Sequence, residues 1–323
     1  MQREWFEYVG AAHVHTTYSD GSWTIPEIAK AATAAGLDFG LITEHMTLEG
    51  LSEEGWYAQT LVLVGYEIND PARKNHYLAF GLKRTLPAGL YPLEYVGRVR
   101  NEGGFGFISH PDEKRSSHPD YPAYPWTEWQ IKGFDGIEIW NYMSEWMESL
   151  NRWNVGFRIL FPALSIRGPT EKTLKFWDSS RDNGKVVAIA GVDVHAMKKR
   201  LGPFNWVVFP YPRMFRTLRT HILLPSPLTG HLDKDKEMVY GALRRGNSFV
   251  SNHLLGDGRR FRFFAEAGNA VYTMGESLRL SEPLRAVAVC PGKGVVSLIR
   301  NGEPILKRKA NWLEYDLAEP GSY

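Results

Sequence analysis

The most informative part of the sequence for the fold is Trp5-Phe6-Glu7-Tyr8-Val9, followed by His13-Val14-His15. The apolar-leaning run predicts a strand, and after the histidines the chain turns through Ser19-Asp20-Gly21. Residues two apart on a strand point to the same face, roughly 6–7 Å apart along it. Two imidazoles in that arrangement can bind one metal ion, so the stretch predicts a metal site at the mouth of a barrel.

Asp193-Val194-His195 repeats this spacing much later in the chain. The two pairs can face each other only if the sheet between them closes, which predicts a barrel. The intervening sequence alternates predicted strands and helices, which favours βα units and a parallel sheet. Strands are expected at 39–42, 61–67, 76–80, 104–109, 136–140 and 186–190, and helices at 24–35, 92–102, 143–160 and 170–183.

Most of the acidic and histidine side chains follow the ends of these strands, where barrels of βα units place their active sites. Nine of them are candidate metal ligands. They are His13, His15, Asp20, His45, Glu67, His76, His110, Asp193 and His195. Nine nitrogen and oxygen ligands without cysteine exclude a structural zinc finger. They exceed the needs of one ion and favour two or three divalent ions, for which zinc, manganese and iron are all suitable.

The end of the chain has a different pattern. From residue 259, alternating apolar residues and the turn pair Asn301-Gly302 predict a small antiparallel β module, preceded by a helix at 235–245. We therefore expect a barrel over 1–225 and a β-rich domain over 226–323. The favoured role of this tail is to pack on the barrel, and the alternative is that His253 or Arg259 reaches over the active site.

Composition limits the classes of partner and compartment. The 323 residues carry a net charge of +2, which gives no reason to expect nucleic acid or an anionic membrane as the main partner. One cysteine, Cys290, allows no internal disulfide. The N-terminus lacks the pattern of a signal peptide, and no run approaches 18 apolar residues. We expect a cytoplasmic protein that acts on a small molecule.

The order of motifs resembles the PHP (polymerase and histidinol phosphatase) family over about residues 8–200. The resemblance rests on His13-Val14-His15, Ser19-Asp20-Gly21, Thr43-Glu44-His45, Gly65-Tyr66-Glu67, His76, His110-Pro111 and Asp193-Val194-His195. It implies an α/β fold with a distorted (β/α)7 barrel and a trinuclear metal centre, to which this chain adds the small C-terminal antiparallel β module.

The resemblance also implies a ligand set for each ion. The first ion takes His13, His15, Glu67 and Asp193; the second takes His76 and His110 with Glu67 as a bridge; the third takes Asp20, His45 and His195. Two positions depart from the family. Glu44 stands where Asp is usual and is expected to orient His45 or its neighbours, and Val192 stands where Ser is common.

The function that this pattern predicts is that of a metal-dependent phosphoesterase using a metal-bound hydroxide. A bound metal lowers the pKa of water from about 15.7 towards 7, so that no Ser or Cys nucleophile is required. Glu44 and Glu138 are expected to support the ligands. Arg167, Lys114 and Arg115 are the candidate groups for holding the phosphate of a small phosphate ester.

Two alternatives remain open. The tail, with Tyr272-Thr273-Met274-Gly275 and Ile299-Arg300-Asn301-Gly302, looks like the carbaryl-hydrolase-type branch of PHP proteins, and the aromatic-rich region 121–177 suits an apolar substrate. Both favour an amide, carbamate or ester hydrolase. The other alternative is a non-catalytic module stabilised by metal, against which the complete ligand set argues.

Overall fold

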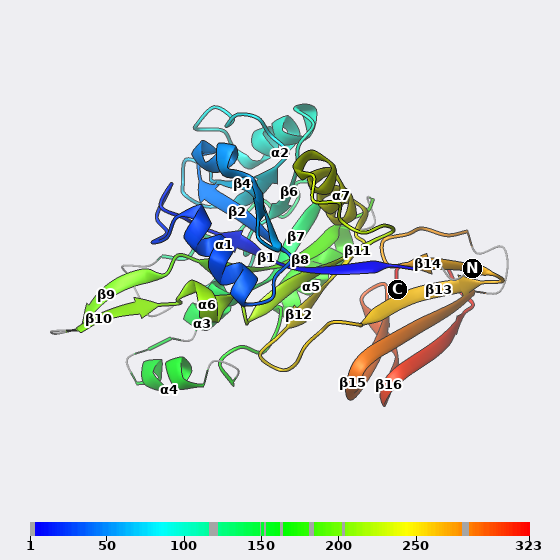
Figure 1. Ribbon diagram of the computed structural model, residues 1–323. Helices are drawn as coiled ribbons and strands as arrows, with labels where there is room; N and C mark the ends of the chain where they lie inside the picture. Colours follow the sequence, from blue (N-terminus) through cyan, green and yellow to red (C-terminus); the bar gives the residue numbers. More distant parts are fainter. Residues whose placement is uncertain are drawn as a thin grey trace.

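A closed seven-stranded barrel forms the larger part of the computed structural model (Figure 1), which describes residues 4–115, 122–148, 150–151, 153–161, 164–180, 184–201, 204–279 and 284–323. The strand order is β1-β2-β4-β5-β6-β7-β8, and pairing of β8 with β1 closes the ring. The strands are β1 (Phe6–Val14), β2 (Phe39–His45), β4 (Thr60–Ile68), β5 (Tyr77–Phe80), β6 (Phe105–Ile108), β7 (Gly136–Asn141) and β8 (Val187–Val194). The predicted closure is therefore confirmed.

One strand of the barrel runs against the others. β5 pairs antiparallel with both β4 and β6, whereas the other barrel neighbours are parallel. The chain between Ile68 and Tyr77 is too short for a crossover helix, and a parallel connection needs a dozen or more residues. The short connection therefore reverses the chain direction at β5.

Helices are fewer than a (β/α)7 barrel requires, so that detail of the prediction is not confirmed. α1 (Ile25–Ala34) follows β1, α2 (Pro92–Asn101) follows β5, and α3 (Tyr142–Glu148), α4 (Val155–Leu160) and α5 (Glu171–Ser180) lie between β7 and β8. After β2 the chain forms only a 3₁₀ turn (Glu49–Glu53) and the short strand β3 (Gly55–Tyr57), and the described residues between β6 and β7 contain no α-helix.

The single helix predicted over 143–160 is wrong, because the chain forms α3 and α4 there instead. The side chain of Asn151 accepts the backbone N–H groups of Trp153 and Asn154, at 2.9 and 3.0 Å. Such a side-chain turn competes with helical hydrogen bonds and interrupts the helix. By contrast, the predicted helix at 24–35 is confirmed as α1, and the Glu27 carboxylate in its first turn accepts the backbone N–H of Thr24 at 2.9 Å.

The barrel sheet continues beyond the ring. β11 (Leu218–Leu224) pairs antiparallel with the first half of β1, and β12 (Ser248–Asn252) extends the sheet from β11. A hairpin of β9 (Met197–Leu201) and β10 (Phe204–Val208) and the short helix α6 (Tyr211–Met214) connect β8 to β11. The predicted helix before the tail is confirmed as α7 (Leu232–Arg245), which ends at Gly246 in the left-handed conformation.

The C-terminal module is a separate four-stranded antiparallel sheet in the order β14-β13-β15-β16. Its strands are β13 (Arg262–Ala267), β14 (Ala270–Thr273), β15 (Leu284–Arg300) and β16 (Glu303–Leu317). Asn301 and Gly302 have φ values of 52° and 87° and form the β15–β16 hairpin turn, as predicted. Residues 284–289 and 295–299 both belong to β15, whose pairing with β16 shifts register between Val289 and Gly294.

The module is attached to the barrel through Glu7 of β1. The Glu7 carboxylate accepts hydrogen bonds from Arg262 at 2.6 Å and from the backbone of Arg260 at 2.9 Å, and it lies 2.8 Å from His221. Arg259 donates to the carbonyl of Gly36, which precedes β2 and so lies at the opposite end of that strand from His45. The structure therefore does not place Arg259 over the candidate site. The domain division at residue 225 stays a prediction.

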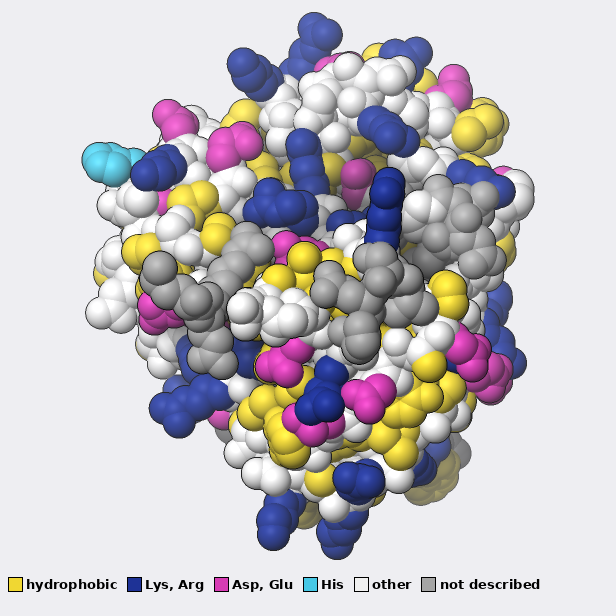
Figure 2. Space-filling model, turned by 90° about the vertical axis from the view of Figure 1, so that its right-hand side faces the viewer, with side chains coloured by type: hydrophobic (Ala, Val, Ile, Leu, Met, Phe, Trp, Pro, Cys, Tyr) yellow, Lys and Arg dark blue, Asp and Glu magenta, His cyan; other side chains and the backbone are white. Residues whose placement is uncertain are grey.

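The face that carries the module has acidic and basic side chains interspersed (Figure 2), in line with the small net charge. In the part of the chain that the structure describes, no helix has the length and apolarity of a membrane span.

The alternation of side chains along the barrel strands separates core from site. Phe39 and Leu41 of β2 and Leu61 and Leu63 of β4 belong to one buried apolar cluster. Because every second residue shares a face, continuing along the same face leads to His45 at the end of β2 and Glu67 near the end of β4. The same strands thus supply apolar packing at one end and polar ligand groups at the other.

Candidate metal centre

The structure brings the nine candidate ligands together at one end of the barrel. His76 directly precedes the antiparallel strand β5, and the others lie at or after the carboxyl ends of parallel strands. They form four overlapping groups, in each of which the ligand atoms lie within 4.8 Å of one another. The groups are His15, Asp20, His45 and His195; His13, His15 and Asp193; His13, Glu67 and His110; and His45, Glu67 and His76. The groups share members, so they form one continuous cluster of six imidazoles and three carboxylates.

Glu67 occupies the centre of this cluster. Its Oε1 lies 2.8 Å from Nδ1 of His76 and 3.3 Å from Nε2 of His110. Its Oε2 lies 3.0 Å from Nδ1 of His45 and 3.4 Å from Nε2 of His13. Because the two oxygens face different sets of imidazoles, this carboxylate has the geometry of a bridge between two ions.

Asp20 and Asp193 lie on either side of His195. Nε2 of His195 is 3.2 Å from Asp20 Oδ1, and its Nδ1 is 3.6 Å from Asp193 Oδ1. The Asp20 side chain is 57% exposed, whereas that of Asp193 is 5% exposed. The cluster is therefore open to solvent on the side of Asp20.

Three of these residues have a backbone conformation that side-chain-bearing residues seldom adopt. The φ angles are 63° at His13, 26° at His110 and 53° at Asp193. Left-handed backbone at residues other than glycine costs free energy, and such positions gather at functional sites. At His13 and Asp193 the parallel β1–β8 pairing also shifts register.

The residues present fit a metal ion. Among the described residues, Nε2 of His13 and both ring nitrogens of His15 are buried and have no hydrogen-bond partner. A buried polar atom without a partner is costly, and such atoms are rare in folded proteins. Divalent ions coordinated by these nitrogens and the neighbouring carboxylates would remove that cost.

The charges of the cluster also suit cations. Burial alone would raise the pKa of Glu67, but the imidazoles of His76 and His13 hold it well below its usual range. Burial, with His195 and His45 nearby, lowers the pKa of His15 to about 3. His15 is therefore neutral near pH 7, and the neutral imidazole is the form that binds metals.

Other cluster histidines attract protons when no metal competes. Although burial opposes it, the Glu67 carboxylate raises the pKa of His45 to about 9. Glu113 and Glu67 have the same effect on His110, whose pKa rises to about 9 against the effect of burial. Metal binding at these imidazoles would displace protons.

Glu138 of β7 is placed to support the ligands. Its carboxylate lies 2.9 Å from Nδ1 of His13 and accepts hydrogen bonds from the hydroxyl of Ser109 at 3.1 Å and from the backbone of His110 at 2.8 Å. Asn141 donates to Glu138 at 2.9 Å and to Asp193 at 3.2 Å. The Glu138 carboxylate thus connects the ends of β1, β6 and β7, and Asn141 extends the network to β8.

Glu44 has another role than orienting the ring of His45. Its carboxylate accepts the backbone N–H of Thr16 at 2.7 Å and the hydroxyl of Ser19. Both partners belong to the turn that leads to Asp20, so Glu44 fixes that turn. Burial raises the pKa of the Glu44 carboxyl.

Gly191 of β8 lies against the carboxylate of Glu138. A Cβ at this position would overlap Oε1 of Glu138 and lie 2.8 Å from Cβ of His13. The absence of a side chain at Gly191 therefore gives the Glu138 carboxylate its place beside His13.

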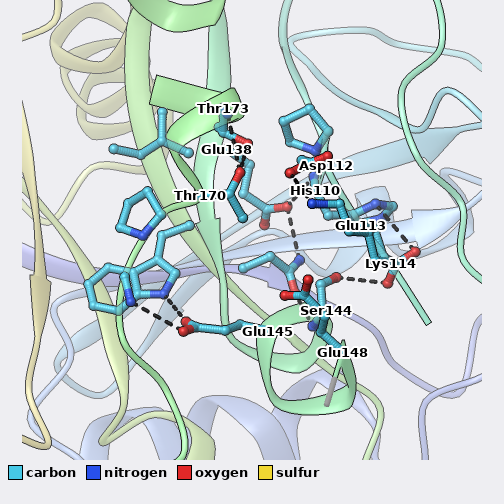
Figure 3. A pocket seen from close by; sticks show the side chains of 16 residues that line it. His110, Asp112, Glu113, Lys114, Glu138, Ser144, Glu145, Glu148, Thr170 and Thr173 are labelled. Atoms are coloured by element: carbon cyan, nitrogen blue, oxygen red, sulfur yellow. Dashed lines mark hydrogen bonds and ion pairs between the residues drawn. The ribbon is translucent and has the colours of Figure 1, made fainter. Parts of the chain in front are cut away.

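Two of the candidate phosphate-binding residues, Lys114 and Arg115, are paired with acidic side chains. Lys114 donates to Asp112 at 2.9 Å and lines a pocket of about 40 Å³ beside His110 (Figure 3). Arg115 is nearly buried and donates to Glu113 at 2.5 Å. Arg167 is exposed, and its backbone N–H donates to Glu145. Their role in substrate binding stays a prediction.

Sequence reasoning missed several residues that hold the cluster. Ser109 directly precedes His110 and Asn141 ends β7, so their positions at strand ends could have indicated them. Tyr211 could not be found in that way. Its hydroxyl donates to the carbonyl of His15 at 2.6 Å. The two residues are 196 positions apart in the sequence, so no local sequence pattern predicts this contact.

Comparisons with known proteins find similarity only at the level of structure. No family model matches the chain, and no curated protein matches it in sequence. A two-domain protein from Bacteroides vulgatus that contains a predicted PHP-like metal-dependent phosphoesterase is 14% identical, with a TM-score of 0.48, and the match covers 97% of this chain and 85% of that one.

Two further solved structures are similar over shorter stretches. A candidate metal-dependent phosphoesterase from Bifidobacterium adolescentis is 16% identical, with a TM-score of 0.40, over 64% of this chain and 94% of that one. An amidohydrolase from Chromobacterium violaceum, with bound sulfate and no metal, is 14% identical, with a TM-score of 0.33, over 60% and 92%.

At TM-scores below 0.5 these likenesses carry no argument about the reaction, which has to come from the site itself. The carbaryl-hydrolase branch is not confirmed. PHP-like metal-dependent phosphoesterases are nevertheless among the solved structures that this chain resembles, as its motifs predict.

Proposed function

We propose that the cluster binds two or three divalent metal ions and that the protein is a metal-dependent hydrolase of small phosphate esters. The observation that carries the proposal is the position of Glu67, whose two oxygens face different imidazoles in a buried cluster with unpartnered ring nitrogens. Zinc, manganese and iron all suit this mixture of imidazole and carboxylate.

When bound, divalent ions supply a water of lowered pKa and positive charge that stabilises the transition state of phosphoryl transfer. The chain's own residues hold the ions in place: Glu138 fixes the ring of His13, and Glu44 fixes the turn of Asp20. Since Asp20 and His45 are the most exposed of the nine, at 57% and 31%, substrate approaches the cluster from their side.

Phosphate-ester chemistry is favoured over the hydrolysis of an amide or carbamate. The aromatic-rich region 121–177 was the feature that suited an apolar substrate. Two of its tryptophans, Trp126 and Trp146, are 1% and 3% exposed and pack in the core. These two are unavailable to a substrate, whereas Trp153 and Phe157 of the same region are 83% and 51% exposed. Tyr124, whose ring lies 5.1 Å from that of His76, is an aromatic residue of this region next to the cluster.

A purely structural metal site fits the arrangement less well. Structural sites are closed by protein ligands, whereas catalytic sites keep a position open. The exposed side chain of Asp20 leaves one edge of this cluster accessible to solvent.

The test is an assay of protein stripped with a chelator and reloaded with manganese, zinc or iron. p-Nitrophenyl phosphate, bis-p-nitrophenyl phosphate and an aryl carbamate serve as substrates, and the Asp193→Asn variant serves as the metal-site control. The proposal predicts metal-dependent turnover of a phosphate ester that is lost in Asp193→Asn. Turnover of the carbamate alone would establish the alternative, and identical activity with and without metal would contradict both.

A further inference from the structure

Tyr211, the first residue of α6, reaches beneath the open side of the cluster. The residue is fully buried. Its hydroxyl donates to the carbonyl of His15 at 2.6 Å, lies 3.4 Å from the carbonyl of His195, and accepts the backbone N–H of Ser22 at 3.2 Å. One hydroxyl thus contacts the backbone of two candidate ligands and of the turn that carries Asp20.

His15 depends on this backbone contact more than His13 and His76 do. Nδ1 of His13 is held by Glu138, and Nδ1 of His76 by Glu67, at 2.9 and 2.8 Å. By contrast, neither ring nitrogen of His15 has a hydrogen-bond partner among the described residues. Metal-binding histidines are usually oriented by a hydrogen bond from the second ring nitrogen, and His15 lacks one.

What orients the ring of His15 is stacking and its main chain. The ring stacks on those of His195 and His45, with centroid distances of 4.0 and 4.4 Å. Stacked rings can slide over one another, so the position of the His15 ring depends on the position of the His15 backbone. That backbone is tied to β8 by its N–H, which donates to Val194 at 3.1 Å, and to α6 by its carbonyl, which accepts from Tyr211.

The turn between β1 and α1 is bound to the same place. The hydroxyl of Ser22 donates to the carbonyl of Ala196 at 2.8 Å, while its backbone N–H donates to Tyr211. Asp20 itself is exposed, so its side chain has no packing to fix it and its position follows that of the turn. The ring of Trp23, 5.1 Å from that of Tyr211, adds a packing contact.

We infer that the Tyr211 hydroxyl is a positioning group for one ion, that of the group His15, Asp20, His45 and His195. The inference rests on the proposed function, since it requires that the cluster binds metal. The hydroxyl acts through the carbonyl of His15 and the turn of Asp20, and of the four groups this one contains both residues. Metal sites need their ligands within about 0.5 Å of the productive geometry, so loss of this anchor affects the site that it holds.

The experiment compares the wild-type protein with Tyr211→Phe and with Tyr240→Phe as a matched control. Tyr240 is also buried, but its hydroxyl has no hydrogen-bond partner among the described residues, so its removal breaks no hydrogen bond. Each protein is stripped with a chelator, shown to melt cooperatively by circular dichroism, and titrated with Mn²⁺ or Zn²⁺ to obtain the number of ions and the affinity of each site.

In Tyr211→Phe we expect one ion to bind about 10- to 100-fold more weakly, the range for changes to groups that orient ligands, while the remaining ions and Tyr240→Phe match the wild type. Equal affinities in Tyr211→Phe and the wild type would overturn the inference. So would equal weakening of every ion, because the effect would then be general. Failure of the wild-type protein itself to bind metal would instead refute the proposed function, on which the inference depends.

Discussion

Oε1 of Glu138 lies 2.9 Å from Nδ1 of His13, and both side chains are fully buried although 125 residues separate them in the sequence. With Nδ1 engaged, Nε2 of His13 faces Glu67 at 3.4 Å and Asp193 at 3.5 Å. A carboxylate on one ring nitrogen fixes the tautomer and makes the other nitrogen a better metal ligand. The contact therefore gives Glu138 a specific role that substitution can test.

The substitution Glu138→Gln keeps the shape of the side chain and removes its charge. We expect metal affinity to fall about 10- to 100-fold, the usual effect of changing a group that orients a ligand. Metal titration of the stripped protein measures it. Glu148→Gln is the control, because Glu148 lines the same small pocket beside His110. Equal metal affinities in the two variants would show that Glu138 does not orient a metal ligand.

The substitution Gly191→Ala tests the same contact from the other side. The added Cβ would meet the Glu138 carboxylate and lie 2.8 Å from Cβ of His13. Overpacking of this kind costs about 1–3 kcal/mol, so we expect a lower free energy of unfolding in denaturant together with weaker metal binding. Gly40→Ala in β2 is matched, since its Cβ would have no atom within 4 Å. If both variants behave alike, the close approach at Gly191 is not as described.

The sequence was most informative where function and secondary structure coincide. Each candidate ligand lies at or near the end of a predicted strand, and closure of the sheet places those ends together, so the cluster follows from the motifs. The antiparallel direction of β5 was not predicted, because strand patterns do not show how a short connection such as 69–76 turns. The small number of helices between the barrel strands was not predicted either.

Contacts between residues that are far apart in the sequence could not be predicted from local sequence patterns. Tyr211 and Asn141 hold the cluster through hydrogen bonds whose partners are distant along the chain. Glu44 was expected to orient His45 or its neighbours. Adjacent residues on a strand point to opposite faces, and Glu44 accordingly contacts the turn at Thr16 instead.

The attachment of the C-terminal sheet should depend on pH through Glu7. Burial alone would raise the pKa of Glu7, but hydrogen bonds from His221, Arg262 and Arg260 outweigh it and lower the pKa below 4.5. A carboxyl group with a lowered pKa in the folded state stabilises the protein above the unfolded-state pKa, and this contribution disappears as the pH falls below it.

We therefore expect Glu7→Gln to be less stable than the wild type at pH 7, with the difference shrinking as the pH is lowered below about 4.5. Urea unfolding at a series of pH values measures this difference. Glu4→Gln, at an exposed position nearby, should show no such trend. A difference that stays constant with pH would show that the ionised carboxylate of Glu7 does not hold the sheet.

Removal of metal should destabilise the barrel. A ligand that binds only the folded state adds about 2.7 kcal/mol at a free concentration of 100 times its Kd. We expect the melting temperature to fall on chelation and to recover on addition of metal. In His13→Ala the response to metal should be much smaller, whereas His231→Ala, at an exposed residue outside the cluster, should respond like the wild type.

The number of metal ions bound per chain is a direct test of the proposal that the cluster binds two or three divalent ions. Protein that has been stripped, equilibrated with Mn²⁺ or Zn²⁺ and freed of excess metal is measured by elemental analysis beside the His13→Ala and Asp193→Asn variants. The account predicts two or three ions per wild-type chain and fewer in each variant. Less than one ion per wild-type chain, with the melting temperature of His13→Ala equal to that of the wild type, would contradict it.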